Sequence, residues 1–272
     1  METARVIVVD REHAGCRALR RTLKVDPRIE VVAEACSVRE ALGHIAASKP
    51  NAVVVADWLP GLRGLTLTST LRRERQHIGT IVLAERLDLD AWVASVEAGA
   101  SGLIWRRTPD EEVVHTIAAV AQGRNLVHER AMADPSIMAR LLTDVRAGYA
   151  DGVAANRYDP GVSARLLGVL DGVVVGMTNR EIGVSAGLAE QTIKHHVSAL
   201  MRAFGARDRI GILRQSLLRG WASIGPDPAP YVQAGRFTGN GNGPAAHAEH
   251  QWTERAAPIG VAAVRDIFVA RA

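Results

Sequence analysis

Cysteine, lysine and long apolar runs are scarce in this sequence, and each scarcity excludes a class of protein. The two cysteines, Cys16 and Cys36, form no CxxC motif, so we expect neither a zinc site nor a disulfide framework, and a reducing, cytoplasmic environment fits best. No apolar run approaches the roughly 20 residues of a membrane helix, and the N-terminus lacks the pattern of a signal peptide. We therefore expect no membrane partner.

Catalytic and cofactor motifs are absent as well. The sequence contains no P-loop, no GxSxG element, no Cys/His nucleophile pair and no metal-spaced His/Cys cluster, so we expect no enzyme, no cofactor and no metal. The basic residues are nearly all arginine: of 33 Lys and Arg residues, only Lys24, Lys49 and Lys194 are lysines. The formal net charge of +4 is compatible with nucleic-acid binding but does not demand it.

Residues 1–123 alternate short apolar runs with segments of helical periodicity. The apolar runs lack polar alternation, which suits strands buried on both faces of a parallel sheet; they are Arg5–Val9, Glu30–Ala33, Ala52–Val55, Thr80–Leu83 and Gly102–Trp105. The helical segments between and after them are His13–Lys24, Val38–Ala47, Leu65–Arg73, Leu89–Ala98 and Pro109–Ala121. Five consecutive βα units predict an α/β, doubly wound domain.

A linker and a tail flank a second predicted domain. Residues 124–157 are expected to form a partly helical linker, in which Ser136–Arg146 could be one helix with Ser136 as its cap and Gly148 belongs to the irregular remainder. Residues 222–272 are dominated by Gly, Pro, Ala and Asn, which predicts a mostly disordered tail. Ile259–Val269 could form a short helix within it.

Residues 158–221 predict an all-α domain of four helices. Asp159, followed by a proline, suits the start of the first helix. Thr178 and Glu181 form a capping box at the start of the second. The third has an apolar face at helical spacing, made of Ile193, Val197, Leu200, Met201 and Phe204, and a last helix covers about Asp208–Arg219.

The second and third of these helices are joined by a tight turn at Gly187, which is the arrangement of a helix-turn-helix. The polar face of the third helix then presents Gln191, Thr192, Lys194, His195, Ser198 and Arg202. Lys, Gln, Ser and His side chains can read base edges, whereas Thr192 and Arg202 suit phosphates, as does Asn179 in the preceding helix. A plain helical hairpin with a polar outer face would show the same periodicity.

The segment Gly176–Val197, followed by Leu200–Arg209, resembles the LuxR/NarL-type DNA-binding domain. The resemblance implies that Lys194, His195 and Ser198 face bases and that the final helix forms a dimer contact on DNA. Two departures from the family pattern are visible. Ala189 replaces the usual Ser or Thr cap of the recognition helix, and Leu166 and Gly168 replace acidic residues of the first helix.

The N-terminal part resembles the receiver domain of response regulators, through Val8–Asp10, Asp57–Gly61, Ala98–Leu103 and Pro109–Val113. Together the two parts match the NarL-type architecture. A receiver needs an aspartate that accepts a phosphoryl group, carboxylates that hold Mg²⁺, a lysine at the phosphoryl oxygens and a hydroxyl that reports the modification.

The resemblance places most of these functional positions on unsuitable residues. The nucleophile position falls on Ala56, the hydroxyl position on Ala84 and the lysine position on Arg106, while of the acidic pair Asp10 remains beside Arg11, with which we expect it to pair. Asp57, one residue past the nucleophile position, is the rival phosphorylation site, although a one-residue shift along a strand turns the side chain to the other face.

Trp58 and Trp105 lie beside these positions in the resemblance. They could line a site for an apolar small molecule, but filling space between the sheet and a helix is the favoured interpretation.

These observations predict a DNA-binding transcription regulator, an atypical response regulator controlled without aspartate phosphorylation. The expected partners are double-stranded DNA, a second copy of the chain in a homodimer and RNA polymerase, with a small-molecule ligand as an open case. The alternative is a protein-interaction or small-molecule-sensing module that modulates another regulator without productive DNA binding.

Overall fold

The computed structural model describes residues 3–74, 77–150 and 158–223, which belong to one compact unit. The tail beyond residue 223, including the predicted helix over Ile259–Val269, lies outside the described residues. Among the described helices, none combines the length and the apolar character that a bilayer crossing requires.

A five-stranded sheet forms the centre of the N-terminal part. Its strands are β1 (Ala4–Val9), β2 (Ile29–Ala35), β3 (Ala52–Ala56), β5 (Gly79–Ala84) and β6 (Gly102–Trp105). They pair in the order β2-β1-β3-β5-β6, every pair parallel, so that Val54 lies opposite both Val8 and Ile81. All five predicted strands are confirmed, and the order is that of a doubly wound sheet whose ligand sites lie at the carboxyl ends of the strands.

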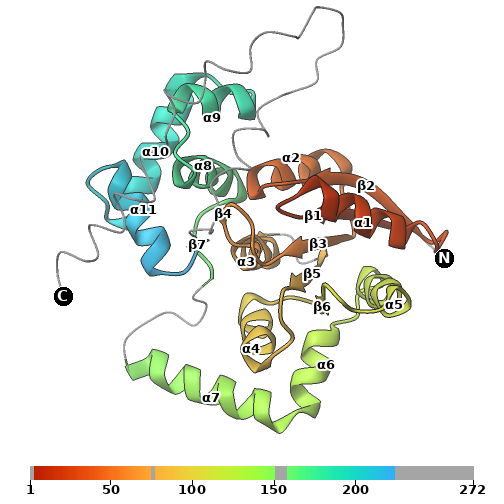
Figure 1. The fold of residues 1–272 in the computed structure, drawn as a ribbon. Coiled ribbons are helices and arrows are strands. Elements are labelled where there is room, and N and C mark those ends of the chain that lie inside the picture. Colours follow the sequence, from red (N-terminus) through yellow and green to blue (C-terminus); the bar gives the residue numbers. More distant parts are fainter. Residues whose placement is uncertain (1–2, 75–76, 151–157, 224–272) are drawn as a thin grey trace, which may run out of the picture. The chain divides into compact units, whose positions relative to one another are not determined.

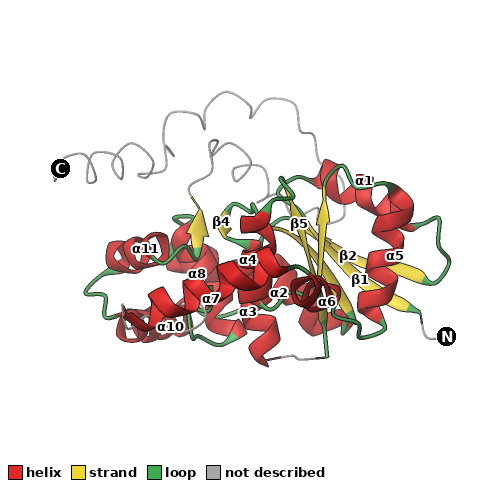
Figure 2. Ribbon diagram, turned by 90° about the horizontal axis from the view of Figure 1, so that it is seen from below, coloured by secondary structure: helices red, strands yellow, loops and turns green. Residues whose placement is uncertain are grey.

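Helices cover both faces of this sheet (Figures 1 and 2). On one face, α1 (His13–Leu23) and α5 (Asp110–Ala121) bury Leu23 and Ile117 completely. The other face carries α2 (Val38–Ser48), α3 (Gly64–Glu74) and α4 (Leu89–Ala98). Helices therefore shield both faces of the sheet from solvent, and the central strand β3 is apolar and buried along its whole length.

The predicted linker begins with two helices, α6 (Leu126–Ala133) and α7 (Pro135–Ala150), that pack against α4. Ala131 and Ile137 are buried with Val93 of α4. Ser136 was predicted to cap the helix that the structure shows as α7, and this prediction was wrong. Ser136 already lies inside α7, and its amide donates to the Asp134 carboxylate at 3.0 Å. The helix α7 also continues past Gly148, and α6 was not predicted.

The C-terminal part contains the four predicted helices, α8 (Ala164–Val174), α9 (Asn179–Ala186), α10 (Glu190–Phe204) and α11 (Arg209–Leu218). The predicted start at Asp159 was wrong. The first helix is capped by Ser163, whose hydroxyl accepts from the Leu166 amide at 3.3 Å. The Asp159 carboxylate instead accepts from the Gly161 amide at 2.8 Å and pairs with Arg73 of α3 at 2.9 Å.

The two parts share one hydrophobic core, in which α8 packs against α2. Asp171 of α8 is buried in this junction, and its carboxylate accepts from the main-chain amides of Leu62 at 3.1 Å and Arg39 at 3.2 Å. Burial raises the pKa of Asp171 to about 6, although both hydrogen bonds oppose the rise.

A second sheet also joins the two parts (Figure 1). Its strands β4 (Gly61–Leu62) and β7 (Ala222–Ser223) are antiparallel, and the Arg63 amide donates to the Trp221 carbonyl at 2.8 Å. The sequence put the start of the tail at residue 222, yet Ala222–Ser223 belongs to the folded unit.

Candidate nucleic-acid interface and receiver pocket

A capping box fixes the start of α9. The Thr178 hydroxyl accepts from the Glu181 amide at 3.3 Å, and the Glu181 carboxylate accepts from the Thr178 amide at 2.7 Å. These bonds from Thr178 lower the pKa of Glu181. At the other end, Gly187 adopts a left-handed conformation, with φ of 64°, and ends the helix. The chain thereby turns from α9 into α10 as predicted.

One face of the helix α10 packs into the hydrophobic core. Ile193, Val197, Leu200 and Phe204 are buried. Its N-cap is Ala189, which makes no side-chain capping bond. This departure from the family pattern therefore leaves the first turn of α10 without the side-chain acceptor that Ser or Thr would provide.

The predicted base-reading residues lie together on the opposite side of α10. Gln191, Lys194, His195, Ser198 and Arg202 are exposed and Thr192 is half-buried. The Lys194 ammonium pairs with the Glu190 carboxylate at 3.0 Å, and the Ser198 hydroxyl donates to the Lys194 carbonyl at 3.0 Å. Gln191 Nε2 and His195 Nε2 are 3.4 Å apart. The exposed groups form a continuous row of donors and acceptors.

Asn179 is held in place by Arg209, a residue that sequence reasoning missed. The guanidinium of Arg209 donates to Asn179 Oδ1 at 3.1 Å and also to the Met177 carbonyl. Burial lowers the pKa of Arg209. Arg209 thus ties the start of α11 to the start of α9 and fixes the predicted phosphate contact, with the Asn179 amide nitrogen left as a donor.

The adjacent histidines point different ways. His195 is exposed, whereas His196 is half-buried and its Nε2 has no hydrogen-bond partner among the described residues. Burial, with smaller contributions from Arg165 and His195, lowers the pKa of His196. Across the described part of the chain, no group of three or more His, Cys, Asp or Glu residues could hold a metal ion.

In the N-terminal part, Asp10 and Arg106 form a two-pronged ion pair at the carboxyl end of the sheet. Arg106 Nη1 lies 2.6 Å from Asp10 Oδ2, and Nη2 lies 3.1 Å from Oδ1. Arg106 Nε also binds the Glu85 carboxylate at 2.6 Å. Burial tends to lower the pKa of Arg106, but the bonds to Asp10 and Glu85 outweigh it and raise the pKa.

The expected pair between Arg11 and Asp10 was wrong. Arg11 pairs with its neighbour Glu12 at 3.3 Å, and Asp10, only 2% exposed, is reached by Arg106 instead. The reason is geometric: α1 approaches closely enough for a side chain at Gly15 to collide with the Asp10 carboxylate, so this acid is closed off on the α1 side.

The nucleophile and hydroxyl positions are apolar and closed. Ala56 is 1% exposed and Ala84 is 5% exposed. Asp57 Oδ2 pairs with Arg63 Nη2 at 2.6 Å, and Asp57 Oδ1 is buried without a hydrogen-bond partner among the described residues. Asp57 is thus engaged by a cation on the loop that leads into α3.

A receiver of this kind would hold Mg²⁺ with two or three carboxylates, and the residues present do not fit that ion. Both oxygens of Asp10 bind Arg106, and the neighbouring acidic position carries Arg11. The Arg106 guanidinium, which binds the carboxylates of Asp10 and Glu85, repels a divalent cation.

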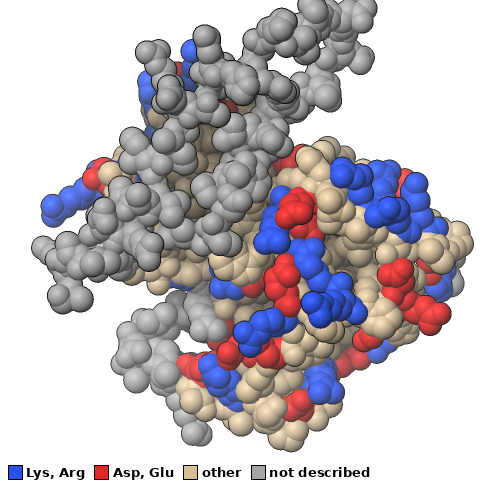
Figure 3. All heavy atoms as spheres, viewed as in Figure 1, with Lys and Arg blue, Asp and Glu red and all other residues tan. Residues whose placement is uncertain are grey.

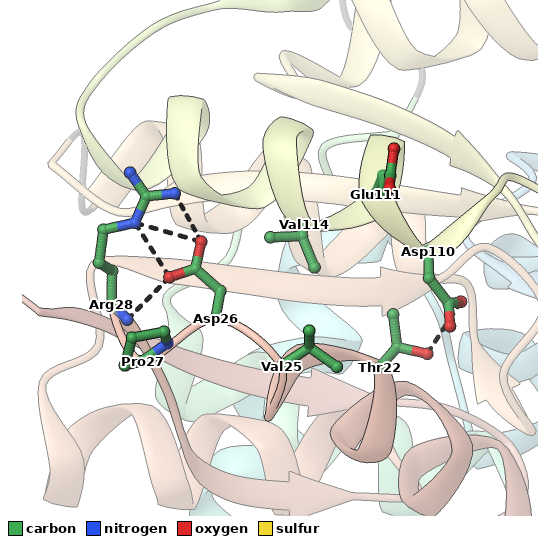
Figure 4. A pocket seen from close by; sticks show the side chains of 8 residues that line it. All are labelled: Thr22, Val25, Asp26, Pro27, Arg28, Asp110, Glu111 and Val114. Carbon is green, nitrogen blue, oxygen red and sulfur yellow. Dashed lines mark hydrogen bonds and ion pairs between the residues drawn. The ribbon is translucent and has the colours of Figure 1, made fainter.

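The two tryptophans do not mark a cavity. Trp58 is 36% exposed; Trp105 Nε1 donates to the Glu85 carbonyl at 3.0 Å, and the Arg107 guanidinium lies 5.6 Å from the centre of its ring. A hollow of about 430 Å³ does exist between the end of α1 and the start of α5 (Figure 4). Val25 and Val114 lie in it between two bonded polar pairs, Asp26–Arg28 and Thr22–Asp110, and it contains no tryptophan.

The face of the N-terminal part that Figure 3 shows carries charges of both signs. Lys and Arg side chains are interspersed with Asp and Glu over the face shown in Figure 3.

Residues 6–118 match the family model of the response regulator receiver domain, and residues 161–215 match that of bacterial regulatory proteins of the luxR family. The DNA-binding transcriptional activator DevR/DosR of Mycobacterium tuberculosis is 31% identical over 210 residues, which cover 75% of this chain and 90% of that protein. The chain belongs to the luxR-type response regulators. It therefore regulates transcription by binding DNA.

Other response regulators show the same relation. The nitrate/nitrite response regulator protein NarP of Escherichia coli is 26% identical over 205 residues, 75% of this chain and 90% of NarP. Among solved structures, a two-component response regulator of the LuxR family from Aurantimonas is 29% identical, with 46% of this chain and 89% of that one covered and a TM-score of 0.44.

Proposed function

We propose that this luxR-type response regulator binds specific DNA sequences through the exposed side of α10 and is controlled without phosphorylation of an aspartate. The observation that carries the second half is the Asp10–Arg106 pair, which uses both oxygens of the one remaining pocket acid. With Ala56 in the nucleophile position, the site lacks the carboxylate that would accept a phosphoryl group.

For DNA binding, we assign base contacts to Gln191, Lys194, His195 and Ser198, and phosphate contacts to Asn179, Thr192 and Arg202. The exposure of the four base-contact residues on one side of α10 supports this assignment, because a recognition helix reads base edges with the side turned away from its own domain. The proposed domain limits are 1–123 for the receiver-like part, 124–157 for the linker, 158–221 for the DNA-binding part and 222–272 for the tail, except that Ala222–Ser223 forms β7 of the folded unit.

The proposed partners are promoter DNA, a second copy of the chain and RNA polymerase. A luxR-type domain recognises a short half-site, so a homodimer on two half-sites about one helical turn apart accounts for specificity. Ile210 and Leu218 of α11 are 68% and 59% exposed, which supports an apolar contact between two copies through this helix.

The phosphorylation half of the proposal is tested with a small phosphodonor. Incubation of the full chain with acetyl phosphate and Mg²⁺, followed by intact-mass measurement, is expected to leave the mass unchanged. The Asp57→Ala variant is the matched control. A phosphoryl adduct on the wild type that this variant loses would identify Asp57 as an acceptor and overturn this half of the proposal.

The DNA half is tested by a mobility shift with DNA upstream of the chain's own gene. Binding is expected to fall steeply with salt, and Lys194→Ala is expected to lower affinity about tenfold, the cost of one good base contact. Lys24→Ala, at the exposed end of α1, is the control and leaves affinity unchanged. Binding that neither variant alters would remove Lys194 from the interface, and no binding at any salt would favour an interaction or sensing module instead.

A further inference from the structure

The only two cysteines of the chain lie together in the fold, although 20 positions separate Cys16 from Cys36. Cys16, in the second turn of α1, is fully buried, and its Sγ lies 3.6 Å from the carbonyl oxygen of Ala35, one peptide bond from Cys36. Chance pairing of the only two thiols in a chain of this size is an unusual coincidence, so the pair calls for a chemical explanation.

A histidine completes the cluster. His13 Nδ1 lies 3.3 Å from Cys36 Sγ. His13 and Cys16 are three residues apart on α1 and therefore project from the same side of the helix, toward the end of β2 where Cys36 lies. Cys36 is half-buried, so solvent reaches the sulfur that contacts the imidazole while Cys16 stays enclosed behind it.

This arrangement suits thiol oxidation better than metal binding. Across the described residues, no group of three or more His, Cys, Asp or Glu side chains, His13, Cys16 and Cys36 included, could hold a metal ion. The pKa of the Cys36 thiol is raised, first by its interaction with Cys16 and then by burial, so this thiol needs a base to lose its proton, and His13 Nδ1 at 3.3 Å is placed to take it.

We propose that Cys16, Cys36 and His13 form a redox site in which a hydroperoxide converts the two thiols to a disulfide. His13 takes the proton of Cys36, and the Cys36 sulfur attacks the peroxide oxygen. The O–O bond breaks, the leaving oxygen takes the proton from His13, and Cys36 becomes a sulfenic acid. Cys16 then attacks the Cys36 sulfur; the S–O bond breaks and the hydroxide leaves as water with the Cys16 proton. Two electrons pass from the thiols to the peroxide.

The site adjoins the junction between the two parts of the molecule. Cys36 precedes Ser37, the cap of α2, and its own amide donates to the Glu40 carboxylate at 2.8 Å. Three residues after Cys36, the Arg39 amide donates to Asp171 of the DNA-binding part. A bond between Cys16 and Cys36 would therefore form beside the helix that contacts α8.

The test treats the native full-length chain with hydrogen peroxide, blocks remaining thiols with N-ethylmaleimide after unfolding, and measures intact mass and peptide masses. A loss of about 2 Da, no maleimide addition and one peptide pair joined through Cys16 and Cys36 are expected. Three results would overturn the proposal: both thiols alkylated, a sulfinic acid on Cys36 with Cys16 still free, or disulfides that join two chains.

Variants separate the roles of the three residues. In Cys16→Ser, the sulfenic acid on Cys36 should persist and react with dimedone, whereas in Cys36→Ser the buried Cys16 should stay reduced in the native protein. His13→Gln should slow oxidation at neutral pH about a hundredfold, the lower end of the range of general-base effects. His115→Gln, on the exposed side of α5, should leave the rate unchanged. Equal rates in both histidine variants would remove His13 from the site.

Discussion

In the free protein, the Lys194 side chain forms an ion pair with Glu190, one turn earlier on α10. Both side chains are about half exposed, at 53% and 46%, so the pair is weak and competes with DNA only modestly. Glu190 also places a negative charge at the start of α10, the end of the helix that we propose to lie near DNA phosphates.

Removing this competitor should tighten DNA binding. We expect Glu190→Gln to raise affinity by about two- to fivefold at low salt, because an exposed ion pair is worth no more than about 1 kcal/mol. Fluorescence anisotropy titration measures the change. The gain should shrink as salt rises, and a weaker complex in the variant would mean that Glu190 itself contacts the DNA.

The Asp10–Arg106 pair should show strong coupling in unfolding. Replacing Arg106 by Met leaves a carboxylate that is 2% exposed without its cation, which should cost about 3 kcal/mol. Asp10→Asn should cost less, and the double variant should recover most of the loss. Urea unfolding of the four proteins gives the coupling free energy. Additive losses would show that the two groups do not stabilise one another.

At the scale of elements, the contact between α8 and the N-terminal part buries the carboxyl group of Asp171. Its pKa is raised from the ordinary 3.8 to about 6, so the folded state holds this proton more tightly than the unfolded state does. Stability contributed by protonation is therefore present at low pH and is lost as pH rises through about 6.

This shift predicts a pH dependence that one substitution removes. Between pH 5 and pH 7 the wild type should lose about 1 kcal/mol of unfolding free energy through Asp171. Asp171→Asn, which cannot titrate, should lack this component, and the difference between the two proteins across the pH range isolates it. Parallel curves for the two proteins would show that the carboxyl does not titrate in this range.

The elements themselves were largely predictable, and their ends and contacts were less so. The strand runs and the capping box of Thr178 are local signals, and both were confirmed. Asp159 was predicted to start a helix because Asp-Pro is common there, but Asp-Pro also suits a turn. In the structure Asp159 pairs with Arg73, a residue that lies far away in the sequence. Nothing local to Asp10 indicates that Arg106 rather than Arg11 would reach it.

At the scale of the whole molecule, the packing of the two parts explains why Leu166 and Gly168 replace the acidic residues of the family pattern. Leu166 packs on the shared core, and a side chain at Gly168 would touch Arg39 and Leu42 of α2. These positions face the N-terminal part, where acidic groups would be buried. The sequence predicted two domains without indicating that they share a core, since such packing depends on surfaces distant in the chain.

A shared core predicts joint unfolding. We expect one calorimetric transition for the wild type, and two for Gly168→Leu, whose larger side chain would push α2 from α8. Gly43→Leu is the matched control: it lies in α2 with open space around it and should keep a single transition. Two transitions already in the wild type would contradict the prediction.

The pairing of β4 with β7 has a practical consequence for dissecting the protein. The hydrogen bonds between β4 and β7 join main-chain groups, which every residue except proline can supply in full. The pairing of the two strands therefore tolerates substitutions of the side chains around it. A fragment that stops before Trp221 would remove the indole that packs on Phe204 at 5.0 Å, together with the edge that Gly61 and Leu62 bind. The stability of the DNA-binding part, measured on such a shortened fragment, would therefore be lower than its stability in the intact protein.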